Sequence, residues 1–138
     1  MTGRLLGWFG ESDEPALDAV TDAETMRNAV DREAIAVAMP PGWTVRSDIV
    51  CYGNDTLTDV LVFRHDRTRQ ELVVVPKSNT DPNGPVRFHH HDRNAGHRRE
   101  LPVTKPSLAA GLSFALGRIE RFQRFFDGRS AALPDSGI

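Results

Sequence analysis

The chain has 138 residues, of which 39% are hydrophobic and 26% are charged, and its formal net charge is −2. This length predicts one domain with its own core, and the composition excludes a collagen-like or wholly disordered chain. No run of about 18 apolar residues is present, which argues against a membrane-spanning helix. Too few apolar residues precede the first acidic ones for a secretory signal, so we expect a cytoplasmic protein.

Charge is divided unevenly along the chain. Residues 1–60 contain four basic and eleven acidic side chains, a net charge of −7, whereas residues 84–129 contain nine basic and four acidic ones, a net charge of +5. Parts of opposite sign can attract each other within one chain or between two copies, and a basic part can also face a nucleic acid. We therefore expect a protein partner or self-association first, with nucleic acid as an alternative partner.

The chain is expected to consist of a flexible N-terminal arm over residues 1–20, a single domain over residues 21–128 and a frayed tail over residues 129–138. Glycines at positions 3, 7 and 10 oppose a helix in the arm. Residues 22–38 predict the first helix, because a T-x-x-E capping box begins at Thr21 and apolar side chains recur at helical spacing. These apolar positions are Met26, Val30, Ala34 and Val37.

Strands are expected next. Residues 43–52 alternate between apolar and polar side chains, which predicts a half-buried strand, and the single cysteine, Cys51, falls on the apolar side and is expected to be buried. Residues 58–65 and 70–76 contain the runs VLVF and LVVV, typical of strands covered on both faces. The short polar link between them predicts an antiparallel hairpin. Residues 85–91 are expected to form a fourth strand, followed by a short return strand.

Residues 105–126 predict the second helix, with Thr104 as its N-cap and Pro106 in its first turn. Its core-facing positions are Leu108, Leu112, Ala115, Ile119, Phe122 and Phe126. The expected fold class is α+β: an antiparallel meander of three to four strands packed by an N-terminal and a C-terminal helix.

One group of residues has the chemistry of metal ligands: His89, His91, His97 and Asp92. Imidazole is the commonest metal-binding side chain and suits zinc. On a strand, His89 and His91 point to one face and His90 to the other. With His97 from the return segment and the Asp92 carboxylate, they would form a site for a divalent metal. The alternative is a solvated, weakly basic surface, on which nearby arginines lower the histidine pKa values and repel a metal ion.

Arginines surround these histidines: Arg87, Arg93, Arg98 and Arg99. Guanidinium groups suit phosphate contacts, and Phe88 or the imidazole rings would stack on bases, so the sequence also indicates a nucleic-acid-binding segment over residues 87–124. In the second helix Arg118, Arg121 and Arg124 are spaced by three, so they drift around the helix and form no single stripe.

No phosphate-binding loop, dinucleotide-binding fingerprint or hydrolase motif is present. We therefore expect a non-enzymatic interaction or regulatory module without an organic cofactor. Two alternatives remain: a metal-dependent hydrolase or nuclease at the histidines, and a nucleic-acid-binding module at the arginines. A hydrolase predicts stoichiometric metal, and a nucleic-acid binder predicts affinity that falls steeply with salt.

Overall fold

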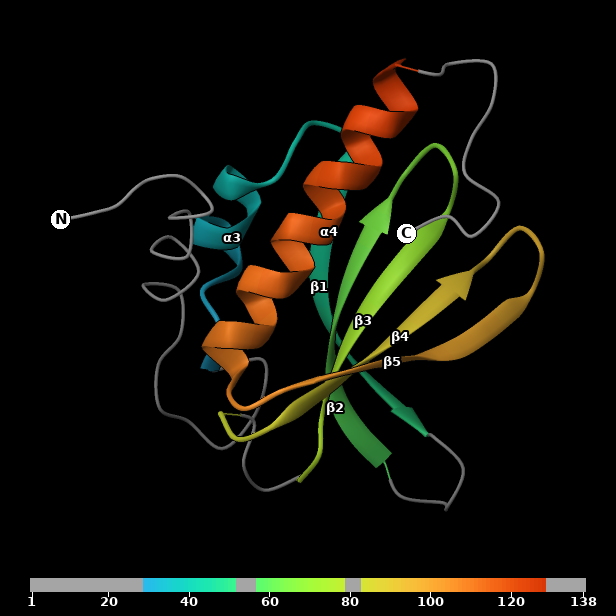
Figure 1. The fold of residues 1–138 in the computed structure, drawn as a ribbon. Helices are drawn as coiled ribbons and strands as arrows, with labels where there is room; N and C mark the ends of the chain where they lie inside the picture. Colours follow the sequence, from blue (N-terminus) through green and yellow to red (C-terminus); the bar gives the residue numbers. More distant parts are fainter. Residues whose placement is uncertain (1–28, 52–56, 79–82, 129–138) are drawn as a thin grey trace, which may run out of the picture.

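The computed structural model describes residues 29–51, 57–78 and 83–128, which form an α+β fold (Figure 1). Five antiparallel strands lie side by side in chain order: β1 (Trp43–Cys51), β2 (Leu57–His65), β3 (Gln70–Pro76), β4 (Val86–Asp92) and β5 (His97–Lys105). The short helix α3 (Arg32–Ala38) and the long helix α4 (Leu108–Gly128) cover the same face of the sheet. The predicted α+β meander with a helix on either side in sequence is confirmed, and the return strand is a full fifth strand of nine residues. No described helix is both long enough and apolar enough to cross a membrane.

The turn between β4 and β5 fixes the register of the candidate site. The Asp92 carboxylate accepts hydrogen bonds from the N–H groups of Asn94 and Ala95, both at 3.1 Å, and Gly96 supplies the left-handed backbone with φ of 73°. Short polar side chains and glycine favour tight turns for these reasons. The turn pairs Asp92 with His97 and sets the neighbouring pairs of the hairpin.

The core lies between the sheet and the two helices. The predicted stripe of α4 is buried at Leu108, Leu112, Ala115, Ile119 and Phe122, and Phe126 packs against it in a partly buried position. β1 is tied to α4 by the indole N–H of Trp43, which donates to the side-chain oxygen of Gln123 at 2.9 Å. The central part of the sheet face under the helices is therefore occupied by packing.

The predicted first helix is wrong in its extent. Asp31 has an extended backbone, and its carboxylate accepts hydrogen bonds from the N–H groups two and three residues later, so it is the N-cap at which α3 begins. From this start α3 turns Ile35 into the core and leaves Val37 87% exposed, although Val37 was expected in the apolar stripe. Residues 1–28, which include the predicted arm and capping box, and the predicted tail over 129–138 lie outside the described residues.

Two further local predictions are wrong. The hydroxyl of Ser107, rather than Thr104, accepts a hydrogen bond from the first turn of α4, at 3.2 Å from the Ala110 nitrogen, because β5 continues as a strand through Lys105. Cys51 is exposed rather than buried. It ends an edge strand at the end of the sheet that α4 does not reach (Figure 1).

At Gly111 the backbone of α4 lies in close contact with the sheet. A Cβ atom at this position would lie 2.5 Å from a methyl group of the buried Val86, whereas one at Gly117 would meet only the end of the Arg121 side chain at 4.0 Å. We expect Gly111→Ala to lower the free energy of unfolding by about 1–3 kcal/mol, the usual cost of overpacking. The matched variant Gly117→Ala is expected to gain up to about 1 kcal/mol from helix propensity. Urea unfolding of both variants checks this, and equal effects would contradict the packing described here.

Candidate functional site

The face of the sheet opposite α3 and α4, which we call the helix-free face, carries no described helix. Strand alternation and the observed register place the following residues of β1 to β4 on it: Arg46, Val60, Val62, Arg64, Glu71, Val73, Val75, Arg87, His89 and His91. Its four valines form a cluster of their own and are at most 3% exposed. The prediction that VLVF and LVVV are buried on both faces is therefore confirmed, with charged side chains surrounding the valines.

Glu71 is the centre of an ion-pair network on this face. Its carboxylate is 1% exposed, and it lies 3.0 Å from Nε of Arg93, 3.5 Å from a terminal nitrogen of Arg46 and 3.6 Å from one of Arg64. We call these three arginines and Glu71 the arginine cluster. The arginine side chains are 28–49% exposed, so they extend from the buried carboxylate to solvent. Arg46 also lies 3.6 Å from the Asp48 carboxylate, so two negative charges face three positive ones and an excess of one positive charge remains.

His91 lies beside this cluster, with Nδ1 at 3.6 Å from the Glu71 carboxylate. Burial, with smaller contributions from Arg93 and Arg98, lowers the pKa of His91 from 6.5 to about 4 against the opposite effect of Glu71. Burial likewise lowers the pKa values of His89 and His90. The three histidines are only 6–8% exposed. They are therefore buried neutral imidazoles at pH 7, and the alternative of a solvated histidine surface is wrong.

A groove of about 770 Å³ opens between the end of β1 and the β4–β5 hairpin. We call it the hairpin groove. Its lining residues are Val50, Cys51, His91, Asp92, Arg93, Gly96, His97 and Arg98. Arg93 joins this groove to the arginine cluster, because its side chain lines the groove and also donates to Glu71. The groove and the cluster are therefore parts of one continuous basic surface.

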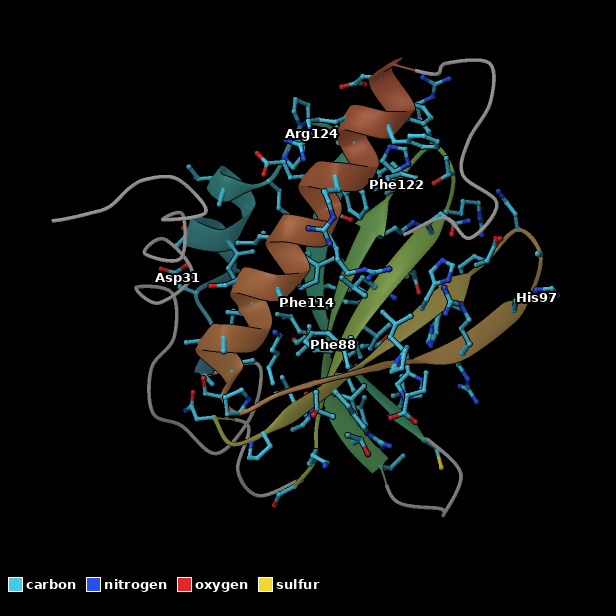
Figure 2. The ribbon with its side chains drawn as sticks, viewed as in Figure 1. Asp31, Phe88, His97, Phe114, Phe122 and Arg124 are labelled. Atoms are coloured by element: carbon cyan, nitrogen blue, oxygen red, sulfur yellow. The ribbon has the colours of Figure 1, made fainter. Side chains whose placement is uncertain are left out.

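The four predicted metal ligands do not converge on one point in the part of the chain that the structure describes. His89 and His91 share the helix-free face as expected, with ring centroids 6.4 Å apart. His97 pairs with Asp92 in the register, so by strand alternation both belong to the opposite face of the hairpin, and His97 is exposed near its tip (Figure 2). Both residues nevertheless line the hairpin groove together with His91. The Asp92 carboxylate is engaged by the turn. Among the residues that the structure describes, no three His, Cys, Asp or Glu side chains are placed to hold a metal ion.

The predicted arginines divide between the two faces. Arg87 alternates with His89 on the helix-free face, where it lies 3.8 Å from the Glu100 carboxylate. Arg98 is paired with His91 on that face, whereas Arg99 is paired with His90 on the helix-covered face.

The arginine cluster also contains residues that were not singled out from the sequence. Arg64 directly follows the VLVF run, and Glu71 directly precedes the LVVV run. The two residues face each other in the register of β2 and β3. The four-residue link of this hairpin was a usable signal, because it sets His65 opposite Gln70 and so places the next pair, Arg64 and Glu71, on one face. Arg46 has no such local signal, because β2 separates its strand from that of Glu71.

Comparison with known proteins finds no matching family model, curated protein or solved structure. The chemistry of the site therefore rests on the residues just described. They provide a buried carboxylate that orients arginines, neutral imidazoles and an open groove with arginines in its wall.

Proposed function

We propose that this protein is a non-enzymatic binding module that holds nucleic acid by its phosphate groups on the helix-free face. The observation that carries the proposal is the arginine cluster, in which three guanidinium groups converge on one buried carboxylate beside an open groove. The planar guanidinium fork matches the geometry of phosphate. Neutralising phosphates with such groups supplies most of the affinity of sequence-independent nucleic-acid binding.

Glu71 prepares the arginines for this role. An arginine side chain loses rotamer entropy when a ligand orders it, and one that is already held loses less. The Arg93 side chain is held by its hydrogen bond to Glu71 and is still half exposed. The neutral imidazoles add no charge at pH 7, so arginine provides the attraction. Contacts of this kind position a strand and carry little sequence information.

An acidic protein surface is a less suitable partner for this face. Protein interfaces depend on a few Trp, Tyr or Arg anchors that pack at a desolvated and largely apolar centre. The valines of the helix-free face are buried within the chain itself and offer no such contact. Phosphate groups bind through charge and hydrogen bonds alone, and the guanidinium groups that provide these are accessible to solvent.

A hydrolase or nuclease is also less well supported. Metal-assisted hydrolysis needs several protein ligands around one ion, and no three of the described His, Cys, Asp or Glu side chains are placed to hold one. The positive charges of Arg93 and Arg98 lie close enough to His91 to lower its pKa. The same charges oppose the approach of a metal cation to this imidazole. We therefore favour binding without catalysis.

The test is the affinity of the protein for a short fluorescent single-stranded oligonucleotide, measured by anisotropy at physiological salt. The double variant Arg93→Gln/Arg98→Gln is expected to bind about tenfold more weakly or worse, because it loses two phosphate contacts. Arg124→Gln is the matched control, because Arg124 lies on α4 beside Met39 and Gln123 (Figure 2). Its affinity is expected to equal that of the wild type.

Thermal unfolding of each variant accompanies the titration and shows that the protein tested is folded. An oligonucleotide that the wild-type protein does not bind would overturn the proposal. So would a folded double variant that binds as tightly as the wild type.

A further inference from the structure

A second basic surface lies on the other side of the sheet, along α4. Phe114, Arg118 and Arg121 are separated by four and three residues, so they form one stripe beside the buried stripe of the helix. Arg124 lies apart from them at a separate pocket with Met39, which agrees with the expectation that the three α4 arginines form no single stripe. Two arginines and one aromatic ring share this side of α4.

The neighbouring strand β5 adds two cations to this stripe. Arg99 is the register partner of His90, and Lys105 is the register partner of Val86, so both belong to the helix-covered face. We call Arg99, Lys105, Phe114, Arg118 and Arg121 the β5–α4 basic cluster. It draws on elements that the chain order and the sheet place next to each other (Figure 1).

Phe114 organises two of these cations. The ammonium nitrogen of Lys105 lies 5.2 Å from the centroid of the Phe114 ring, and the guanidinium carbon of Arg118 lies 5.6 Å from it. Both distances are within the range of cation–π attraction. The ring is itself fixed, because it packs on Phe88 with centroids 4.7 Å apart between β4 and α4 (Figure 2). Positive charges from two different elements are therefore held against the same aromatic ring before any ligand binds.

Arg118 is repelled by the positive charges of two neighbouring arginines, Arg121 and Arg99. Burial lowers the pKa of Arg118, and the charges of Arg121 and Arg99 lower it further. Like charges held together raise the energy of the free protein, and an anion that binds among them relieves this repulsion. The cluster thus combines fixed cations, partial burial and mutual repulsion, which together favour an oxyanion of high charge density.

We propose that the β5–α4 basic cluster is a second anion site, which binds a phosphate group. It stands apart from the proposed function, because none of its residues belongs to the arginine cluster or lines the hairpin groove. A phosphate group carries several oxygens that accept hydrogen bonds from Lys and Arg. The phosphate can belong to a small phosphorylated ligand or to the backbone of a nucleic-acid strand, and the chemistry at the protein is the same.

The test uses inorganic pyrophosphate as the probe and the thermal unfolding midpoint as the readout, with sodium chloride at equal ionic strength as the reference. A ligand that binds only the folded state raises the midpoint in a concentration-dependent manner. We expect pyrophosphate to raise the midpoint of the wild type well above the chloride reference. The double variant Lys105→Gln/Arg121→Gln is expected to lose most of this rise. Arg124→Gln, outside both basic surfaces, is expected to keep it.

A second titration replaces pyrophosphate with the single-stranded oligonucleotide. If Lys105→Gln/Arg121→Gln weakens the effect of both probes, the site holds the phosphates of a strand; if it weakens only that of pyrophosphate, the site holds a small phosphorylated ligand. The proposal is overturned if pyrophosphate has no more effect than chloride. It is also overturned if the rise is undiminished in Lys105→Gln/Arg121→Gln.

Discussion

Lowering the pH from about 7.5 to about 4.5 is expected to reduce the free energy of unfolding by about 2 kcal/mol or more through the buried histidines. His91 makes the largest single contribution, since its pKa is lowered from 6.5 to about 4. Burial lowers the pKa values of His65, His89 and His90 in the same direction. Each of these imidazoles is neutral in the folded protein at neutral pH.

The sign follows from which state binds the proton more tightly. In the unfolded chain a histidine protonates as the pH falls through about 6.5, while the folded protein still holds His91 neutral. Protonation therefore favours the unfolded state over this range. For His91 the stabilisation is complete above the unfolded pKa, declines as the pH falls below it, and is lost once the pH has passed the folded pKa of about 4.

Urea unfolding followed by tryptophan fluorescence at the two pH values measures this loss, and Trp43 in the core is a suitable reporter. His91→Gln is expected to show a pH-dependent loss that is smaller by about 2 kcal/mol. His97→Gln, at the exposed tip of the hairpin, is expected to behave as the wild type. An equal loss in His91→Gln and the wild type would show that His91 is not held neutral by the fold.

Removing the charge of Glu71 is expected to destabilise the protein by about 2–3 kcal/mol in the variant Glu71→Gln. The Glu71 carboxylate is buried and forms ion pairs with Arg46, Arg64 and Arg93. Loss of one partner of a buried ion pair costs about 3–5 kcal/mol when the remaining charge stays buried. Here the arginines are partly exposed and can regain water, which reduces the cost.

Glu100→Gln is the matched control for Glu71→Gln. The Glu100 carboxylate is exposed and lies 3.8 Å from Arg87 across the β4–β5 pair, so its removal is expected to cost less than about 1 kcal/mol. Chemical unfolding of both variants at neutral pH gives the comparison. Equal stabilities of the two variants would mean that Glu71 does not organise the arginine cluster.

The sequence predicted the fold because the signals for it are local. The period-two alternation of β1, the apolar runs of β2 and β3 and the stripe of α4 each depend on neighbours along the chain. The errors lie at boundaries, where one side chain decides the outcome. Asp31 caps α3 and so turns Ile35 rather than Val37 into the core.

The candidate site could be predicted only in part. Strand alternation was enough to place His89 and His91 on one face, which the register confirms. The convergence of Arg46 on Glu71 was beyond sequence reasoning, because it spans two strand spacings of about 4.7–4.9 Å each and depends on the long arginine side chain. The burial of the histidines was also missed, because it depends on how the whole sheet packs.

The most direct test of phosphate binding on the helix-free face is the salt dependence of oligonucleotide affinity. For single-stranded nucleic acid, each phosphate contact contributes about 0.7 to the slope of the logarithm of affinity against the logarithm of salt concentration. We predict a steep slope for the wild type, reduced by about 1.4 in Arg93→Gln/Arg98→Gln and unchanged in Arg124→Gln. A slope that is the same in all three proteins would contradict the assignment of phosphate binding to this face.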